Sequence, residues 1–371
     1  MARIDSLNVL LDPSGKMLLS ELYKGVVENV QKTAVSMAIK NQDLSGDPEA
    51  GSVEAKRFQN AAAADYGTAR TAGYGSKVKG KPVTIPIDTD REFVEEIEAK
   101  DIKLLGVQGL LERRSANHQL RLRAELDTKF FAEMLAAGYA FVPDANASIL
   151  DTIEAAILNV ETTKNEYVDG VPRDMITVVC SPETYSEIRN NLDNTKNANV
   201  TTDMAEFDYF HGCKVFSEHH IPTGVKFFVA VDGSVAQPVL VRPYTAERIP
   251  LSEAMAVSMF FYYGTKAVTP DLIMYVATAS GLTITAAAGS TSGNTKLTVV
   301  PATAGSGNAF VYKTGTSVAV PFVGEDLTAW TSWNGTADIS AATGNDVVVA
   351  IIDSATKKCI KAGKVKSIAH A

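Results

Sequence analysis

The stretch from Gln108 to Gly138 most constrains the fold of this chain, because it predicts one long helix. It contains no proline, its glycines are confined to its two ends, and strong helix formers fill its middle. A helix of about 30 residues is a rod of roughly 45 Å, which a small round core does not need. The pattern therefore predicts an elongated subunit built on this rod. The apolar residues that recur at helical spacing are Leu111, Leu122, Leu126, Phe130 and Met134, with Leu110, Phe131 and Leu135 beside them.

Length, charge and cysteine content exclude several classes of protein. The 371 residues are enough for two or three domains. A formal net charge of -8 argues against a dedicated nucleic-acid binder but not against a protein that surrounds nucleic acid. Cys180, Cys213 and Cys359 are odd in number and far apart, which predicts no disulfide framework and a reducing cytoplasm. No apolar run reaches the ~20 residues of a membrane span, and the first residues do not resemble a signal peptide.

The chain before the long helix predicts two projecting parts. Lys16–Asn41 has an amphipathic helix pattern, and its apolar stripe needs a partner in this subunit or in a neighbour. Val83, Ile85 and Ile87 alternate with polar residues and prolines, which predicts an edge or protruding strand. We expect residues 63–103 to form a charged two-stranded arm with a Gly-rich tip and little core of its own.

The chain after the long helix predicts an α+β domain, because helices and strands mix around one sheet. The predicted helices are Asn146–Thr162 and the segment that starts at Ser181-Pro182-Glu183, and the predicted strands are Asp174–Cys180, Cys213–Ser217, Lys226–Asp232 and Val235–Arg242. Ser252–Val276 is apolar on both faces, which predicts paired strands packed on the long helix.

Composition changes near Ala277, and short strands then alternate with Gly-rich turns. The pattern predicts an all-β sandwich, plausibly immunoglobulin-like. Trp330 and Trp333 could line a sugar-binding face, or one of them could fill the core of the sandwich. The predicted strands are the segments LTIT, TKLTVV, NAFVYK, SVAVPF, VVVAIID and KCIKAGKVKSI.

Two motifs suggest bound ligands, and each also has a plainer explanation. Residues 75–81 have the spacing of a phosphate-binding loop, but Pro82 replaces the expected Ser or Thr, so a flexible basic tip is the better interpretation. Four potential zinc ligands lie within ten residues, but the second half of a paired motif is absent. We therefore favour ordinary strand and loop residues for His211, Cys213, His219 and His220.

The remaining polar residues predict surfaces rather than catalysis. A solvated face explains the carboxylates Asp88, Asp90, Glu95, Glu96 and Glu98. We expect His118 to face solvent or a partner. The helix arginines fit contact with a nucleic-acid backbone or salt bridges; they are Arg113, Arg114, Arg121 and Arg123. No nucleophile, base and orienting group converge, so we predict no enzyme and no catalytic, cofactor-binding or metal-binding residues.

The order of parts resembles the major capsid proteins of tailed bacteriophages, which have the Hong Kong 97-like fold. PVTIPIDTDREFVEEIEAKDIK is similar to their extended loop, QLRLRAELDTKFFAEMLAAG to their spine helix, and ITVVCSPETYSEIR to the start of their axial domain. RIPLSEAMAVSMFFYYGTKAVTPDLIMYV is similar to their closing peripheral strands. The implied parts are an N-terminal arm (1–53), an extended loop (54–107), a spine with peripheral domain (108–145), an axial domain (146–241), peripheral strands (242–277) and the sandwich (278–371).

This resemblance implies a structural protein of the virion that is assembled in the bacterial cytoplasm. Its copies would form hexamers and pentamers, and these an icosahedral shell with weak nonspecific contact to the packaged double-stranded DNA. A separate scaffolding protein, a portal and possibly decoration proteins would be partners, with no membrane and no cofactor. Loop lysines could cross-link to a neighbour, although we favour noncovalent locking; they are Lys77, Lys79 and Lys81. The alternatives are an encapsulin-type bacterial compartment shell, a secreted β-rich adhesin and an enzyme of unknown type.

Overall fold

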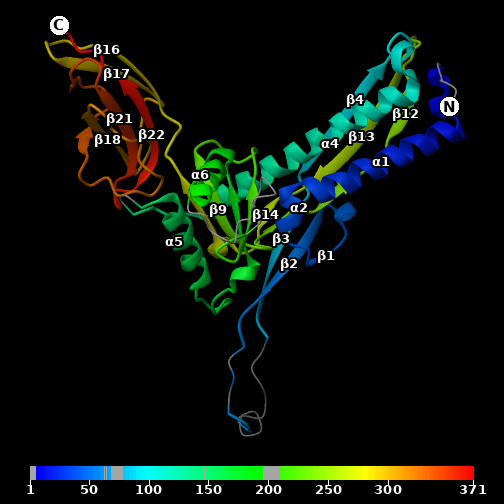
Figure 1. Cartoon of the computed structure of the whole chain (residues 1–371), viewed down its shortest axis with the longest axis horizontal. Helices are drawn as coiled ribbons and strands as arrows, with labels where there is room; N and C mark the ends of the chain where they lie inside the picture. Colours follow the sequence, from blue (N-terminus) through cyan, green and yellow to red (C-terminus); the bar gives the residue numbers. More distant parts are fainter. Residues whose placement is uncertain (1–5, 62, 64, 68–77, 145–146, 195–208) are drawn as a thin grey trace.

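The computed structural model describes all residues except 1–5, 62, 64, 68–77, 145–146 and 195–208. A central body carries two arms that diverge from it and a narrow hairpin that projects away from both (Figure 1). One arm is built on helices α1 and α4, and the other is the C-terminal sandwich. Among the described residues, no helix has the length and apolar character needed to cross a bilayer.

Helix α4 (Ile102–Ala137) is the predicted spine and has 36 residues. It begins earlier than predicted because a short helix precedes a kink at Gly106, where φ is 72°. It ends before Gly138 as predicted. A Cβ atom at Gly138 would lie 2.7 Å from Ile273 Cγ2, so only glycine allows the helix to turn directly into β5 (Tyr139–Ala140).

The N-terminal segment forms two helices where the sequence predicts one. A short 3-10 helix, η1 (Leu7–Leu11), precedes α1 (Pro13–Thr33), and an extended residue, Ala34, separates α1 from α2 (Val35–Ile39). Leu19, Val26 and Val30 of α1 are buried against the spine and the sheet beneath it. The apolar stripe of α1 therefore has its partner within the same subunit.

Beneath α1 and α4 lies the peripheral sheet, in which β13 (Met255–Tyr263) is the central strand. One edge of β13 pairs along its whole length with β4 (Thr89–Ile97). The other edge pairs with β12 (Thr245–Arg248) and β11 (Val239–Val241). Every second residue of β13 is buried, so one face of this sheet contacts the helices and the other faces outward.

The central body is a six-stranded sheet with helices on one face and the end of the spine on the other. Ile153 and Ile157 of α5 (Ile149–Glu161) and Ile188 of α6 (Pro182–Asn194) cover the first face. Phe130, Phe131 and Met134 of α4 cover the second. In order across the sheet, the strands are β5, β15 (Ile273–Ala277), β9 (Val225–Val231), β6 (Ile176–Cys180), β8 (Cys213–Ser217) and β7 (Tyr209–Phe210).

Two predictions about strands in this part of the chain are wrong. The single strand predicted at 235–242 is in fact two strands, β10 (Val235–Ala236) and β11, because Pro238 between them has no N–H to donate. β10 pairs with β14 (Lys266–Ala267). The strands predicted to pair within 252–276 lie in different sheets, since β13 is peripheral and β15 is central. The short 3-10 helices are η3 (Arg173–Met175) and η4 (Pro270–Leu272).

The projecting hairpin consists of β2 (Ser52–Phe58) and β3 (Gly80–Pro86), with β1 (Leu44–Ser45) and η2 (Pro48–Ala50) at its base. The prediction of a two-stranded arm over 63–103 is therefore wrong. Residues 89–97 belong to the peripheral sheet, where Phe93 and Ile97 pack towards the spine and the whole strand pairs with β13 rather than with a hairpin partner. β3 is an edge strand of its small sheet, as its prolines predict.

The C-terminal sandwich has two sheets. The segment SVAVPF is not a strand. Residues 317–322 cross the side of the larger sheet that points away from the smaller sheet, and Val318 N–H donates there to the carboxylate of Asp346. Trp333 is buried against Phe310, whereas Trp330 is only partly buried. The predicted all-β sandwich is confirmed, and its immunoglobulin-like character stays a prediction. The smaller sheet has the strand order β16 (Thr283–Ala288), β17 (Asn294–Val300) and β20 (Ile339–Ser340). The larger sheet has the strand order β19 (Thr331–Trp333), β18 (Asn308–Gly315), β21 (Asp346–Asp353) and β22 (Cys359–Lys366).

Candidate functional site

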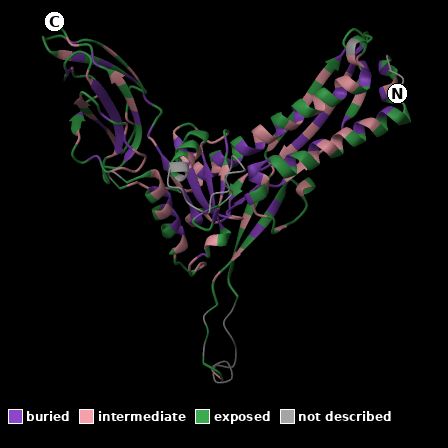
Figure 2. Cartoon of the chain, in the orientation of Figure 1, coloured by how far each residue is buried: buried purple, intermediate pink, exposed green. Residues whose placement is uncertain are grey.

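The hairpin formed by β2 and β3 has a buried apolar base. Val53, Ala55 and Ile85 are buried there against Ala236 and Val268 of the body. Farther along, most of the described residues of the hairpin are exposed (Figure 2). A two-stranded ribbon of this kind is marginal on its own in water, so its exposed part gains stability by contacting another surface.

The exposed part of the hairpin combines apolar and cationic side chains. Phe58 and Val78 are 55% and 84% exposed. Lys56, Lys79 and Lys81 are also exposed, and none of these three has an ion-pair partner among the described residues. We call these five residues the hairpin surface.

The outward face of the peripheral sheet has the complementary composition. Val94, which is 53% exposed, lies opposite Ser258, and the half-buried residues Phe260 and Tyr262 follow on the same face of β13. Exposed carboxylates surround this apolar strip, and within the described residues no ion pair involves them. We call the strip and these carboxylates the outer face. The carboxylates are Asp90, Glu92, Glu96 and Glu247.

Glu95 and His118 depart from their predicted exposure. His118 is only 4% exposed, stacks on Phe93 with ring centroids 4.8 Å apart, and its Nδ1 lies 2.7 Å from the hydroxyl of Tyr244. The prediction that it faces solvent or a partner is wrong, because it lies four residues before Leu122 on the buried stripe of α4. Burial lowers the pKa of His118, against the opposite influence of Glu95. Glu95 also turns inward, where it pairs with Arg114.

The spine arginines divide into paired and unpaired residues. Arg114 binds Glu95, and Arg123 donates from Nη2 to Glu218 Oε2 at 3.1 Å. Arg113 and Arg121 are exposed, and among the described residues neither has an ion-pair partner. Salt bridges within the subunit therefore account for half of the predicted set, and the other half remains available for other contacts.

Arg123 belongs to a buried polar cluster, the spine hub, which we define as Arg123, Asp127, Glu218 and His220. Asp127 and Glu218 are fully buried. His220 Nδ1 lies 2.6 Å from Glu218 Oε1, and Asp127 Oδ1 accepts a hydrogen bond from the backbone N–H of Ser36 at 2.9 Å. The hub thus joins the spine, the loop after β8 and the N-terminal helices.

The two carboxyl groups of the spine hub have pKa values shifted in opposite directions. Burial raises the pKa of Asp127. Burial also acts to raise the pKa of Glu218, but hydrogen bonds from His220 and Arg123 outweigh it and hold that pKa below its usual range. Ligand atoms of Asp127, Glu218 and His220 lie within 4.8 Å of one another, a spacing that suits a metal ion. The guanidinium of Arg123 already supplies positive charge to both carboxylates, at 3.1 and 3.5 Å.

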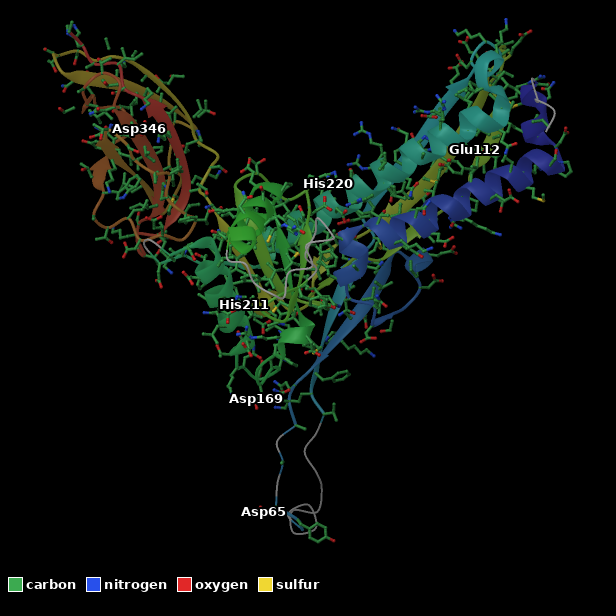
Figure 3. All side chains as sticks on the ribbon, viewed as in Figure 1. Asp65, Glu112, Asp169, His211, His220 and Asp346 are labelled. Carbon is green, nitrogen blue, oxygen red and sulfur yellow. The ribbon has the colours of Figure 1, made fainter. Side chains whose placement is uncertain are left out.

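The other candidate ligands do not converge. His211 lies at a turn with φ of 50° and contacts Glu154, whereas Cys213 is buried in the sheet. Figure 3 shows His211 and His220 in different parts of the body. In the predicted phosphate loop, residues 75–77, including Lys77, lie outside the described residues. Gly80 and Lys81 begin strand β3, whereas a phosphate loop requires a helix at this point.

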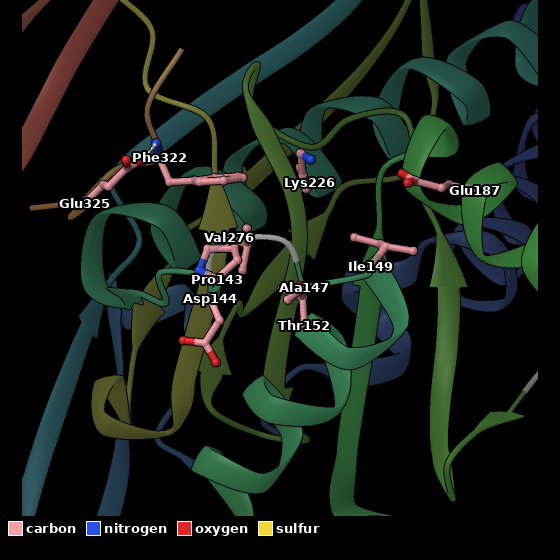
Figure 4. Close-up of a pocket in the computed structure, with 10 residues that line it drawn as sticks. All are labelled: Pro143, Asp144, Ala147, Ile149, Thr152, Glu187, Lys226, Val276, Phe322 and Glu325. Atoms are coloured by element: carbon pink, nitrogen blue, oxygen red, sulfur yellow. Dashed lines mark hydrogen bonds between the residues drawn. The ribbon is translucent and has the colours of Figure 1, made fainter. Parts of the chain in front are cut away.

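The sandwich packs directly on the central body. Val323 N–H donates to Ala277 O at 2.9 Å, and Ala279 N–H donates to Pro321 O at 2.8 Å. Lys226 Nζ lies 5.3 Å from the ring centroid of Phe322. These contacts border an open groove of about 380 Å³ whose lining mixes apolar residues with Asp144, Glu187 and Glu325 (Figure 4). Among the described residues that line it, no nucleophile lies next to a base.

Comparison with solved structures identifies the fold. The chain is similar to a structure of Mycobacterium phage Che8, with a TM-score of 0.50 and 18% identity over 66% of this chain and 90% of that chain. It also matches the capsid of Cyanophage P-SCSP1u, with a TM-score of 0.47 and 13% identity over 63% and 84% of the two chains. The capsid of an empty GTA particle matches with a TM-score of 0.47 and 12% identity over 66% and 89%.

The chain therefore has the α+β fold of phage capsid structures, and the predicted Hong Kong 97-like fold is confirmed. Residues 287–362, within the sandwich, match a family model described as the S-layer protein SbsC C-terminal domain. No curated protein sequence matches the chain.

Proposed function

We propose that this chain is the major capsid protein of a tailed bacteriophage. Copies associate as hexamers and pentamers, and these close into an icosahedral shell around packaged double-stranded DNA. The fold supports this proposal, as does the absence of a convergent catalytic set among the described residues. The chain acts as a structural component of the virion and assembles in the host cytoplasm.

The observation that carries the proposal is the complementarity of the hairpin surface and the outer face. The hairpin surface has Phe58 and Val78 among lysines, and the outer face has an apolar strip among carboxylates. Within one subunit the hairpin projects away from the peripheral sheet (Figure 1), so the two surfaces meet between copies. The hairpin of one copy lies across the peripheral sheet of its neighbour, which gives the lattice both apolar burial and charge pairing.

The other partners follow from charge and exposure. Arg113 and Arg121 supply weak, nonspecific contact with DNA phosphates, and the net charge of -8 prevents tight binding of a tightly packed genome. A scaffolding protein, a portal and decoration proteins complete the assembly. The sandwich, which we propose to be immunoglobulin-like, stands on the outside of the shell. Its match to a domain of a surface-layer protein supports a module that functions on an assembled protein surface.

Charge reversal tests the proposed contact. The double variant Lys79→Glu/Lys81→Glu and the double variant Glu92→Lys/Glu96→Lys each place like charges opposite each other between copies. We expect each to stay folded and to lose most closed shells in electron microscopy. Combining all four substitutions in one chain restores opposite charges at every contact, so shells return.

Lys296→Glu/Lys313→Glu, which changes the charge of the sandwich by the same amount, is the matched control and assembles normally. If the reversed variants assemble like the unmodified chain, the hairpin does not bind the outer face. If the unmodified chain stays a small monomer when expressed with its neighbouring genes, the capsid proposal itself fails.

A further inference from the structure

Arg57 lies on β2 just beyond the buried base of the hairpin. Its side chain is 13% exposed, and its Nη2 lies 2.5 Å from Asp271 Oδ2 in η4. Its guanidinium also lies over the ring of Tyr167, 4.2 Å from the centroid. Arg57 is thus held by two elements of the body while its own strand continues away from the body.

The residues that follow β2 strengthen the same contact. Gln59 Nε2 donates to Glu166 Oε2 at 2.6 Å, and the backbone N–H of Asn60 donates to Glu166 O at 2.9 Å. Asp271 in turn accepts a hydrogen bond from Asn165. The loop 164–169 and η4 therefore form a clamp on one side of the hairpin.

At the level of Arg57, the described residues of the opposite strand make no comparable contact with the body. Gly80, Lys81 and Pro82 of β3 are exposed at the level of Arg57. Burial alone would raise the pKa of Asp271, but Arg57 and Asn165 outweigh burial and hold that pKa below its usual range. Asp271 is therefore ionised at neutral pH, so the ion pair with Arg57 persists. Without the clamp, the hairpin would pivot about the apolar base at Val53 and Ile85.

We infer that Arg57 is a positioning residue that sets the angle at which the hairpin leaves the body, and through it the curvature of the shell. This inference rests on the proposed function. Tyr66 lies nine residues after Arg57, and nine residues span at most about 30 Å, so a small rotation at Arg57 can become a displacement of several ångströms at Tyr66. Neighbouring copies then meet at a different angle, which changes the diameter of a closed shell.

Three variants and two measurements test the inference. Arg57→Ala removes the ion pair and the stacking, and Asp271→Asn removes the charge partner. We expect at least tenfold faster hydrogen exchange of the Asn60 amide in the unassembled subunit of each variant. We also expect shells whose diameters are broadly distributed in cryo-electron microscopy, where the unmodified chain gives one size. Arg57→Lys keeps the charge and loses the stacking, so its distribution is intermediate.

Lys364→Ala is the matched control, since it breaks an ion pair of 2.8 Å in the sandwich, far from the hairpin. It keeps the diameter of the unmodified shell. If Arg57→Ala fails to assemble, the Arg57→Lys and Asp271→Asn shells give the diameters to compare. Uniform shells of normal size from these variants overturn the role of Arg57 and leave the capsid proposal standing. Failure of the unmodified chain to assemble overturns the capsid proposal instead.

Discussion

His118 lies in the apolar stripe of α4 between Leu111 and Leu122, yet its polar character suggested a solvent-facing position. Spacing was the stronger signal, because a residue four positions before a buried Leu lies on the same helix face. The ring is neutral and stacked between Phe93 and Tyr244. A buried neutral histidine makes stability depend on pH.

Because its pKa is lowered in the folded protein, His118 binds a proton more readily in the unfolded chain, whose value is near 6.5. The free energy of unfolding therefore falls as the pH drops through 6.5 towards the folded-state pKa. We expect the decrease between pH 7.5 and 5.5, measured by urea unfolding, to be larger for the unmodified chain than for His118→Gln. Equal decreases would show that His118 is accessible to protons in the folded state.

Asp127 is a second polar residue on a buried face, one position after Leu126. Asp127→Ala leaves the buried Ser36 N–H without its acceptor and removes the ion pair with Arg123, which costs about 3 kcal/mol of unfolding free energy. Asp127→Asn keeps an oxygen that accepts from the Ser36 N–H, so its free energy of unfolding falls by less. Urea unfolding of the two variants measures the difference, and equal losses would mean that the charge, not the hydrogen bond, stabilises this position.

At the scale of elements, α4 offers two leucines six positions apart with opposite exposure. Leu126 is fully buried, whereas Leu120 is 64% exposed. Leu126→Asp buries a charge without a partner and abolishes soluble expression. Leu120→Asp changes the free energy of unfolding by less than about 0.5 kcal/mol. Comparing the soluble yields and the unfolding curves of the two variants tests which face of the spine is buried.

The sequence predicts most elements, because helix periodicity and strand alternation are local properties. α5, α6 and β8 lie where their patterns indicate, and Ser148 caps α5 by accepting from the N–H of Asp151 at 3.1 Å. Strand pairing is nonlocal and was missed: β4 pairs with β13, which follows far along the chain. The spine hub is nonlocal for the same reason, since Asp127 of α4 and Glu218 of the loop after β8 meet only in the folded chain.

The whole molecule combines a shell fold with a sandwich that has its own core of Phe310, Trp333 and Val349. Because this core is separate from the cores of the body, a chain ending at Ala277 should fold. The truncated chain lacks Val323, which packs against the core of the body, and is therefore less stable. It keeps both the hairpin surface and the outer face. We expect closed shells with a smoother outer surface in electron microscopy. A soluble truncated chain that does not assemble would place the sandwich within the lattice.

Shortening the hairpin should impair shell assembly, whereas removing the sandwich should not. Replacing residues 60–78 by an Asn-Gly turn joins Gln59 to Lys79, which already form a backbone hydrogen bond of 3.0 Å, so the buried base of the hairpin stays paired. The shortened subunit keeps the apolar contacts of Val53 and Ile85 and has the circular dichroism of the full chain. It loses Val78 but keeps Lys56, Phe58, Lys79 and Lys81 of the hairpin surface, so we expect fewer closed shells than from the full chain. Shell yields equal to those of the full chain would mean that the four retained residues are enough for the contact, and the charge-reversed variants would then still fail to assemble.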